Sequence, residues 1–401
     1  MTIYICTLKT SYAYISGFPI QRQLHFSDNR KIRAYLNAGQ LHAPRFQPFL
    51  LFQRDDPFHR RIDYLPQIEA DRPADERAED LAGRVTVEQI AGLMCFSAHV
   101  KTLENDYSVT DEQKEFLGGN VRAVLNALSG YPAFQQATWA NNLQAFVEAS
   151  DNKIPVNFSS DPRNGKNCTD WPGNLALAAT FDPAVAKQTG AGIAKEMREM
   201  GVSTFLGPQT DVSTDPRWQR TYGTFGEDPA LISEIMAHII PRIQGSDHGV
   251  TEDGVAVTTK HFPGGGAREN GFDPHYAAGQ WNVYATPGSL ETYHLPPFAA
   301  AVKAGTSSIM PYYSKPAAAK SAVQHDLAGN TVEMKPYGFA YNKYFIDTML
   351  RGQMGFDGYI NSDTGIAHNM AWGVEMLDVP ERIGYAVANA GRGYLHHLPT
   401  S

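Results

Sequence analysis

The stretch Val255–Gly266 reads VAVTTKHFPGGG and combines two different patterns. Its first half is rich in β-branched residues, which is typical of a buried strand. Its second half ends that strand with Lys260, His261, a proline and three glycines. Glycine has no Cβ, so a glycine-rich segment lets the backbone pass close to a neighbouring group or ligand. The stretch therefore predicts a buried strand that carries two polar side chains to its carboxyl end.

Short strand-like runs alternate with amphipathic stretches along most of the chain. The predicted strands cover residues 91–97, 121–128, 154–160, 202–208, 255–262, 307–313 and 357–363. The predicted helices include residues 182–201, 228–245 and 295–305, each of which ends in glycine, a frequent helix C-cap. This alternation predicts an α/β fold with a parallel sheet and helical crossovers. The wide strand spacing favours a (β/α)₈ TIM-like barrel, and no G-x-G-x-x-G motif follows the first strand to support a dinucleotide-binding fold.

The composition narrows the class of protein. The chain has 401 residues, of which 42% are hydrophobic, and its formal net charge is −8. This length allows a sizeable core, and the absence of a basic run argues against a nucleic-acid partner. Because no apolar run could span a bilayer and no signal-peptide pattern is visible, we expect a cytoplasmic protein without a membrane partner. The cysteines Cys6, Cys95 and Cys168 are too scattered for a zinc site or a disulfide framework.

Three segments of the chain differ in their sequence pattern. Residues 1–71 show no sustained period, and we expect an N-terminal extension of undefined structure. Residues 72–391 carry the alternating pattern and form the predicted barrel domain. Residues 392–401 form a short atypical tail, so the sequence predicts no second α/β domain.

Polar side chains follow five of the predicted strands. They are Asp161 after the third strand; Asp211, Arg217 and Arg220 after the fourth; Lys260 and His261 at the fifth; Tyr313 at the sixth; and Asp363 at the seventh. The chemistry of a (β/α)₈ barrel takes place at the carboxyl ends of its strands, so we expect these groups to meet on one face. An aspartate after a strand can also be a helix N-cap or a turn residue. Together these groups suit a hydroxyl-rich neutral substrate such as a sugar, because they make charge-assisted hydrogen bonds to hydroxyls.

Several segments, taken in order, resemble glycoside hydrolase family 3. KHFPGGG (260–266) is similar to the family's lysine–histidine motif, and DPRWQRTYGTFGEDP (215–229) is similar to its D-P-R-W segment. GFDGYINSDTG (355–365) resembles the segment that carries the family's nucleophilic aspartate. ERAEDLAGRVTVEQIAGLM (76–94) is similar to its opening helix. The resemblance covers residues 73–391 and implies the N-terminal barrel domain of the family.

The resemblance implies an exo-acting, retaining glycosidase of the β-glucosidase type. Asp363 would be the nucleophile that forms a covalent glycosyl-enzyme, and Tyr313 would lie beside it. The hydroxyls of the terminal sugar would be held by Asp161, Arg220, Lys260 and His261. The substrate would be a β-linked oligosaccharide or glycoside, and no metal or other cofactor is implied. A cis Phe262–Pro263 bond is also expected, whereas Arg217 could form a structural ion pair instead of a substrate contact.

Two features near the nucleophile depart from the family pattern. Thr364 stands where many relatives have a tryptophan. The second domain that usually supplies the general acid/base is missing, and none of the three acids after Asp363 matches that residue; they are Glu375, Asp378 and Glu381. The loop GFDPHY places Asp273 and His275 near the position of an Asp–His pair in single-domain β-N-acetylhexosaminidases of the family. His275 could therefore be the acid/base, or a loop histidine that Asp273 merely orders.

The end of the chain also departs from the pattern. RGYLHHLPTS follows a predicted helix at residues 380–391 where relatives have an eighth strand. We therefore expect free edges at the strands 91–97 and 357–363, and a truncated or frame-shifted reading frame. Three hypotheses follow: a β-glucosidase-type enzyme, a single-domain β-N-acetylhexosaminidase that uses Asp273 and His275, and a catalytically incomplete sugar-binding remnant.

Overall fold

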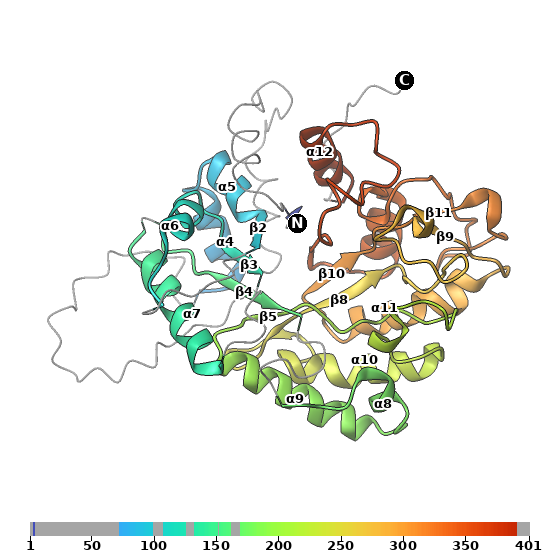
Figure 1. The fold of residues 1–401 in the computed structure, drawn as a ribbon, viewed down its shortest axis with the longest axis horizontal. Helices are drawn as coiled ribbons and strands as arrows, with labels where there is room; N and C mark the ends of the chain where they lie inside the picture. Colours follow the sequence, from blue (N-terminus) through green and yellow to red (C-terminus); the bar gives the residue numbers. More distant parts are fainter. Residues whose placement is uncertain are drawn as a thin grey trace, which may run out of the picture.

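An eight-stranded parallel sheet is the centre of the fold (Figure 1). The structure is a computed structural model that describes residues 3–4, 72–98, 107–125, 132–150, 152–161 and 169–390. The strands are β1 (Ile3–Tyr4), β2 (Cys95–Ala98), β3 (Ala123–Leu125), β4 (Asn157–Ser160), β5 (Thr204–Phe205), β8 (Ala256–Phe262), β10 (Ser308–Pro311) and β12 (Tyr359–Ile360). They lie in the order β1-β2-β3-β4-β5-β8-β10-β12, so each strand pairs with its predecessor in the chain, as expected for a barrel sheet.

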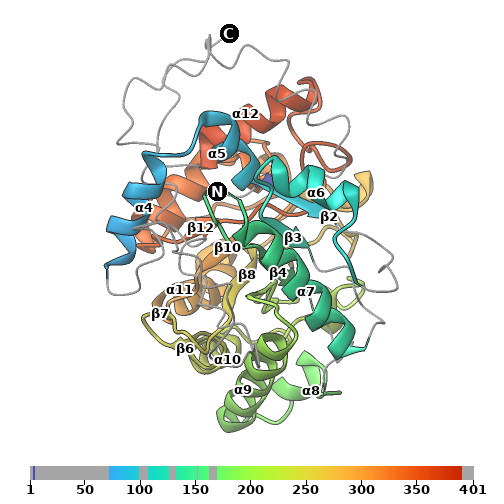
Figure 2. The same cartoon turned by 90° about the vertical axis from the view of Figure 1, so that its left-hand side faces the viewer.

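Helices separate most consecutive strands, as the alternation of the sequence predicted. They are α4 (Ala74–Ala82), α5 (Val87–Leu93), α6 (Asp111–Gly118), α7 (Ala133–Glu148), α8 (Asn174–Ala178), α9 (Pro183–Glu199), α10 (Pro229–Gln244), α11 (Leu295–Lys303) and α12 (Val379–Ala390). Helices α9 and α10 pack side by side along the sheet, as both views show (Figures 1 and 2). No helix in the described part of the chain is long and apolar enough to cross a membrane. The architecture is thus the predicted TIM-like arrangement of strands and helices.

The barrel does not close within the residues that the structure describes. Within the described ranges, no strand pairs with the outer edge of β12, and β1 and β12 stand at opposite ends of the strand order. The expected free edge at the strand 91–97 is wrong. The strand observed there, β2, pairs with β1 through Ile3↔Cys95 and Tyr4↔Phe96. A short piece of the predicted N-terminal extension therefore extends the sheet, whereas the tail at 392–401 lies outside the described residues.

The predicted opening helix at residues 76–94 is wrong, because two helices, α4 and α5, cover it. Helix α4 ends at Ala82, and a turn leads to Thr86, which caps α5. The Thr86 hydroxyl accepts the Gln89 N–H at 3.2 Å, and the Gln89 side chain accepts the Thr86 N–H at 2.9 Å. This reciprocal capping box starts a new helix inside a sequence whose apolar spacing looks continuous. The sequence analysis also missed α7, a helix of 16 residues.

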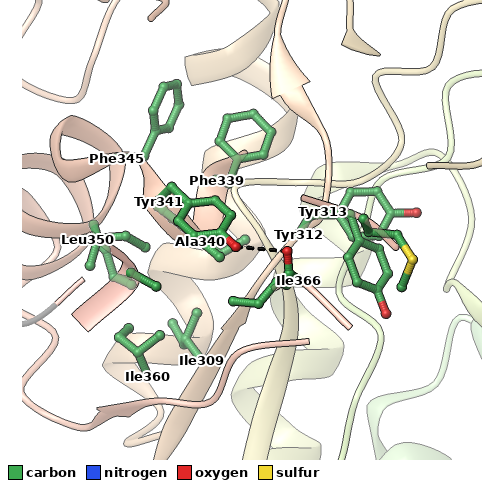
Figure 3. Close-up of a cluster of buried hydrophobic side chains, with 14 of the residues drawn as sticks. Ile309, Tyr312, Tyr313, Phe339, Ala340, Tyr341, Phe345, Leu350, Ile360 and Ile366 are labelled. Atoms are coloured by element: carbon green, nitrogen blue, oxygen red, sulfur yellow. Dashed lines mark hydrogen bonds between the residues drawn. The ribbon is translucent and has the colours of Figure 1, made fainter. Parts of the chain in front are cut away.

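A cluster of buried side chains joins β10 and β12 to the segments that follow them (Figure 3). Ile309 of β10 and Ile360 of β12 are register partners and are both buried. The Tyr341 hydroxyl donates a hydrogen bond to the Ile366 carbonyl at 2.8 Å, drawn as the dashed line in Figure 3. Because Ile366 lies three residues after Asp363, this packing fixes the turn that carries the predicted nucleophile.

Ile240 provides a test of the core between the sheet and the helices. Its side chain on α10 is fully buried in a cluster with residues of β8. Ile240→Ala should lower the free energy of unfolding by about 2–5 kcal/mol, because it removes buried methylenes and leaves a cavity. Urea denaturation followed by tryptophan fluorescence measures this change. Glu234→Ala, at an exposed position of the same helix, is the control; equal destabilisation by both variants would contradict the assigned packing.

His294 makes stability depend on pH. Its imidazole is buried against Tyr284, with ring centroids 5.6 Å apart, and burial together with the charge of Arg268 lowers its pKa to about 4 despite Asp211. The unfolded chain protonates this histidine near pH 6.5, so the unfolded state binds more protons between pH 4 and 6.5. Stability should rise with pH across this window and fall by roughly 3 kcal/mol as the pH drops through it.

Urea titrations at several pH values measure this contribution. The dependence should be shallower in His294→Gln, whereas His248→Gln at an exposed site should leave it unchanged. An unaltered slope in His294→Gln would show that another group causes the pH dependence.

Candidate active site

The predicted site residues come together at the carboxyl ends of the strands. Asp161 directly follows β4, Lys260 and His261 lie at the end of β8, Tyr313 follows β10, and Asp363 follows β12. Parallel strands that share one sheet deliver these side chains to the same edge. The sequence therefore predicted the location of the cluster from the strand pattern alone.

Lys260 and Asp161 form an ion pair on one side of this edge. The Lys260 Nζ lies 2.9 Å from Asp161 Oδ2, and the side chains are 5% and 33% exposed, respectively. The peptide bond Lys260–His261 is cis, and so is Phe262–Pro263, as predicted. The pair presents one ammonium and one carboxylate at a partly open position, where both can bind hydroxyls.

The glycines after His261 serve the protein's own packing. A Cβ on Gly265 would lie 2.8 Å from the Tyr312 ring, and a Cβ on Gly266 would clash with the Val212 carbonyl oxygen. Gly264 has φ +117°, a conformation that strongly favours glycine. The sequence predicted that these glycines bring the backbone close to the bound sugar, whereas the groups that the structure places against them are Tyr312 and Val212.

Asp211 fixes the position of His261 through two hydrogen bonds. It is fully buried, and its Oδ2 lies 2.8 Å from His261 Nδ1, while its Oδ1 accepts the His261 backbone N–H at 3.1 Å. On the other side of the ring, Arg220 Nη2 lies 3.1 Å from His261 Nε2. A guanidinium can only donate, so Nε2 accepts and the imidazole proton resides on Nδ1, facing Asp211. His261 is thereby fixed as a neutral, oriented side chain.

Asp363 lies next to this chain of contacts. Its Oδ2 is 3.7 Å from His261 Nε2, and its Oδ1 accepts the Thr364 N–H at 2.7 Å. Residues 364–378 form turns and no helix, so Asp363 is not a helix N-cap. Tyr313 hydrogen-bonds to Asp363, and burial followed by the charge of Asp363 raises the Tyr313 pKa well above its ordinary value. Tyr313 therefore stays protonated beside the carboxylate.

Tyr312 and Arg268 also lie in the site, although the sequence analysis assigned neither of them to it. The buried Tyr312 ring lies 4.7 Å from the His261 ring and has the guanidinium groups of Arg220 and Arg268 at 5.8 Å and 5.3 Å. Burial lowers the pKa of Arg220, but the ionisable groups around it raise the pKa by more; they are Tyr312, Asp363, Asp211 and Asp273. Arg220 therefore remains a cation inside the site. Arg268 does not directly follow a predicted strand, so its place in the site becomes apparent only from the fold.

Arg217 does not belong to this cluster. Its side chain is 65% exposed, and its Nη2 pairs with Asp215 Oδ2 at 2.7 Å. The structural ion pair that we considered for this arginine is therefore what the structure shows.

Asp273 and His275 form a pair at the rim of the site. The His275 ring hydrogen-bonds to Asp273 through Nδ1, and its backbone N–H donates to the same carboxylate at 3.1 Å. The Trp218 indole N–H donates to Asp273 at 3.0 Å. Burial raises the Asp273 pKa, but these hydrogen bonds lower it by a larger amount. The net pKa is below the ordinary value for aspartate, so the carboxylate is ionised. The ring of His275 lies 4.8 Å from that of Tyr313, which links the pair to Asp363.

The acids after Asp363 have structural contacts. Asp378 and Glu381 exchange hydrogen bonds of 2.9 Å between side chain and backbone at the start of α12. Glu375 accepts the Gly373 N–H at 2.9 Å and lies 3.4 Å from Lys315 Nζ. These contacts explain the three carboxylates as loop and helix-cap residues.

Known proteins resemble this chain over most of its length. The family model described as "Glycosyl hydrolase family 3 N terminal domain" matches residues 60–387. "Beta-glucosidase C" of Emericella nidulans is 33% identical over 356 residues, covering 83% of this chain and 55% of that protein. The "Periplasmic beta-glucosidase/beta-xylosidase" of Dickeya chrysanthemi is 32% identical, covering 80% and 52%. The chain thus spans about half the length of these curated relatives.

Solved structures show the same fold. A glycoside hydrolase family 3 beta-N-acetylglucosaminidase from Paenibacillus sp. superposes with a TM-score of 0.62 at 22% identity, covering 77% of this chain and 54% of that one. At this identity the match supports the fold alone. Together with the family-model match and the relatives above 30% identity, it establishes that the chain belongs to glycosyl hydrolase family 3 and carries the N-terminal domain of that family.

Proposed function

We propose that this chain hydrolyses O-glycosidic bonds as an exo-acting, retaining glycosidase of the β-glucosidase type. The observation that carries the proposal is the position of Asp363, whose Oδ2 lies 3.7 Å from Nε2 of His261. The buried groups Asp211 and Arg220 hold the ring of His261 from its two nitrogen atoms. The curated relatives named as β-glucosidases support this substrate class. A carboxylate that neutral and cationic groups hold in place at a strand end suits attack on an anomeric carbon.

Asp363 is the nucleophile in this proposal. Its carboxylate oxygen forms a bond to the anomeric carbon while the bond to the leaving oxygen breaks, and the leaving oxygen takes a proton from a general acid. Water then attacks the glycosyl-enzyme, transfers its proton to the conjugate base and releases Asp363. Tyr313 and the Thr364 N–H orient the carboxylate through their hydrogen bonds.

The other site residues hold the sugar. Lys260 and Asp161 offer a charged donor and a charged acceptor, and Arg220 offers further N–H groups next to His261. Such charge-assisted hydrogen bonds are roughly twice as strong as neutral ones. This donor and acceptor set supports a substrate whose terminal sugar presents several hydroxyls.

A second candidate function is β-N-acetylhexosaminidase activity with His275 as the acid/base. The observation that favours it is the Asp273–His275 pair, whose imidazole packs on Tyr313 beside Asp363. With Nδ1 bonded to Asp273, the Nε2 atom is the position that exchanges a proton with the leaving oxygen. A structural neighbour described as a beta-N-acetylglucosaminidase is consistent with this alternative.

Turnover of p-nitrophenyl β-glucoside and β-N-acetylglucosaminide tests the nucleophile and the sugar preference. The purified chain should release nitrophenol, and Asp363→Asn should reduce kcat by roughly 1000-fold or more, because the amide cannot form the glycosyl-enzyme. Asp253→Asn, at an exposed position, is the matched control and should retain activity. The preferred substrate decides between the two candidate functions. A folded chain without turnover on either substrate would instead support a catalytically incomplete remnant.

The leaving group reports the role of His275. If its imidazole protonates the leaving oxygen, His275→Gln should reduce kcat by about 100- to 10,000-fold on a phenyl glycoside. The loss of kcat/KM, which reports formation of the glycosyl-enzyme, should be much smaller on a 2,4-dinitrophenyl glycoside, because dinitrophenolate leaves without a proton. His248→Gln, an exposed histidine, serves as control. Equal losses on both leaving groups would assign His275 a structural role.

A further inference from the structure

The outer edge of β12 carries backbone groups that pair with no strand of the described sheet. The Tyr359 N–H donates to the Ser307 carbonyl at 3.3 Å, on the β10 side of the strand. The Asn361 N–H donates to the Ile309 carbonyl at 3.0 Å, on the same side. Backbone groups of successive residues point to opposite edges of a strand, so the N–H and the carbonyl of Ile360 face away from β10. Ile360 therefore presents a donor and an acceptor at the edge where the described sheet ends.

The chain itself already covers this edge. Ile360 is 1% exposed in a single copy of the chain, so water does not reach its N–H and carbonyl. Buried backbone groups are paired in nearly all native structures, because an unpaired one costs free energy comparable to a lost hydrogen bond. We therefore expect a partner strand for Ile360 inside the same chain, since an edge that is buried in this way is closed to a second copy.

The hydrophobic core is continuous across the opening of the sheet. One cluster of buried side chains contains both Cys95 of β2 and Ile360 of β12, which lie near opposite ends of the strand order. Among the described residues, this cluster includes none from β4 or β5. The contacts that join its members therefore cross the opening and do not run around the sheet, so β2 and β12 lie on two sides of one packed core.

Strand β1 has the position and the direction that this opening requires. It pairs with β2 in parallel, and β3 occupies the other edge of β2. Strand β12 is parallel to β10, and every pair between them in the order is parallel as well. The free edges that remain in the described sheet are those of β1 and β12. A barrel of this kind has eight parallel strands, and its two outermost strands pair to close it.

We propose that β1 closes the barrel by pairing in parallel with the outer edge of β12. The interaction surface is the free edge of β12, and its partner is the strand Ile3–Tyr4 of the same chain. The backbone of β1 accepts the Ile360 N–H and donates to the Ile360 carbonyl. The N-terminal extension thereby takes the eighth position of the barrel, and the strand that leads to Asp363 is held from both sides. This inference does not depend on the proposed function.

Amide hydrogen exchange of the full chain, followed by NMR with isotope-labelled isoleucine, tests this pairing. The Ile360 N–H should exchange slowly, as a paired and buried amide does. Ile3→Pro/Tyr4→Pro removes the N–H groups of β1 and should accelerate this exchange by about tenfold or more. Ile3→Val/Tyr4→Phe keeps strand-forming residues and should leave the exchange unchanged. The Ile240 N–H in α10 is the internal reference for a folded chain.

Further measurements identify the strand that pairs with β12. Neither deletion of residues 392–401 nor dilution of the protein should change the exchange of the Ile360 N–H. In a chain whose native cysteines are replaced by alanine, Ile360→Cys should form an intramolecular disulfide with either Ile3→Cys or Tyr4→Cys, because paired strands bring such residues within reach.

Several results would overturn this inference and leave the proposed function intact, since none of the measurements involves turnover. They are fast exchange of the Ile360 N–H in the unaltered chain, protection that survives the proline variant, protection that is lost with residues 392–401, and a disulfide-linked dimer in place of the monomer. If the proline variant unfolds, as fast exchange of the Ile240 N–H would show, the disulfide decides. Its formation within one chain supports the pairing, and its absence from both cysteine pairs overturns it.

Discussion

One buried carboxylate organises the end of strand β8. Asp211 has no exposed surface, and it accepts backbone N–H groups of His261 and Gly265 as well as the imidazole proton of His261. A buried carboxylate is tolerated only when hydrogen bonds replace its water. These three donors all come from the KHFPGGG segment, so the requirement of Asp211 fixes the path of that segment. The ring of His261, and with it the contact to Arg220, takes its position from that segment.

The charges of the site are arranged in alternation. Lys260 faces Asp161, and the ring of His261 lies between the Asp211 carboxylate on its Nδ1 side and the Arg220 guanidinium on its Nε2 side. The Tyr312 ring lies 5.8 Å from the Arg220 guanidinium and 5.3 Å from the Arg268 guanidinium, so both cations can interact with its π face. Arg268 also donates hydrogen bonds to the Gly279 carbonyl and the Ser314 hydroxyl, which replace part of its hydration. The same arrangement leaves partly open acceptors and donors for the hydroxyls of a sugar.

The site and the open barrel belong to different parts of the sheet. The residues that we assign to sugar binding and nucleophilic attack follow β4, β8, β10 and β12, whose pairing is continuous through β5. The position where the described sheet does not close lies between β12 and β1. The geometry around Asp363 depends instead on the cluster in Figure 3, where Tyr341 holds the carbonyl of Ile366. An intact half of the barrel can therefore present an ordered site.

The sequence by itself determined the order of the parallel strands after Cys95 and the helices α9, α10, α11 and α12. It also determined that five site residues lie at strand ends: Asp161, Lys260, His261, Tyr313 and Asp363. The family resemblance added the cis Phe262–Pro263 bond. The sequence could do so because alternation and strand-end chemistry are local patterns that also occur in the family motifs. Only the tertiary structure decided that β1 extends the sheet and that Asp211 holds His261. It also showed which arginine of the D-P-R-W segment belongs to the site: Arg217 lies on the surface, and Arg220 is buried in the site. These outcomes depend on contacts between segments far apart in the chain, and a local pattern contains no information about which distant group will neutralise a given charge.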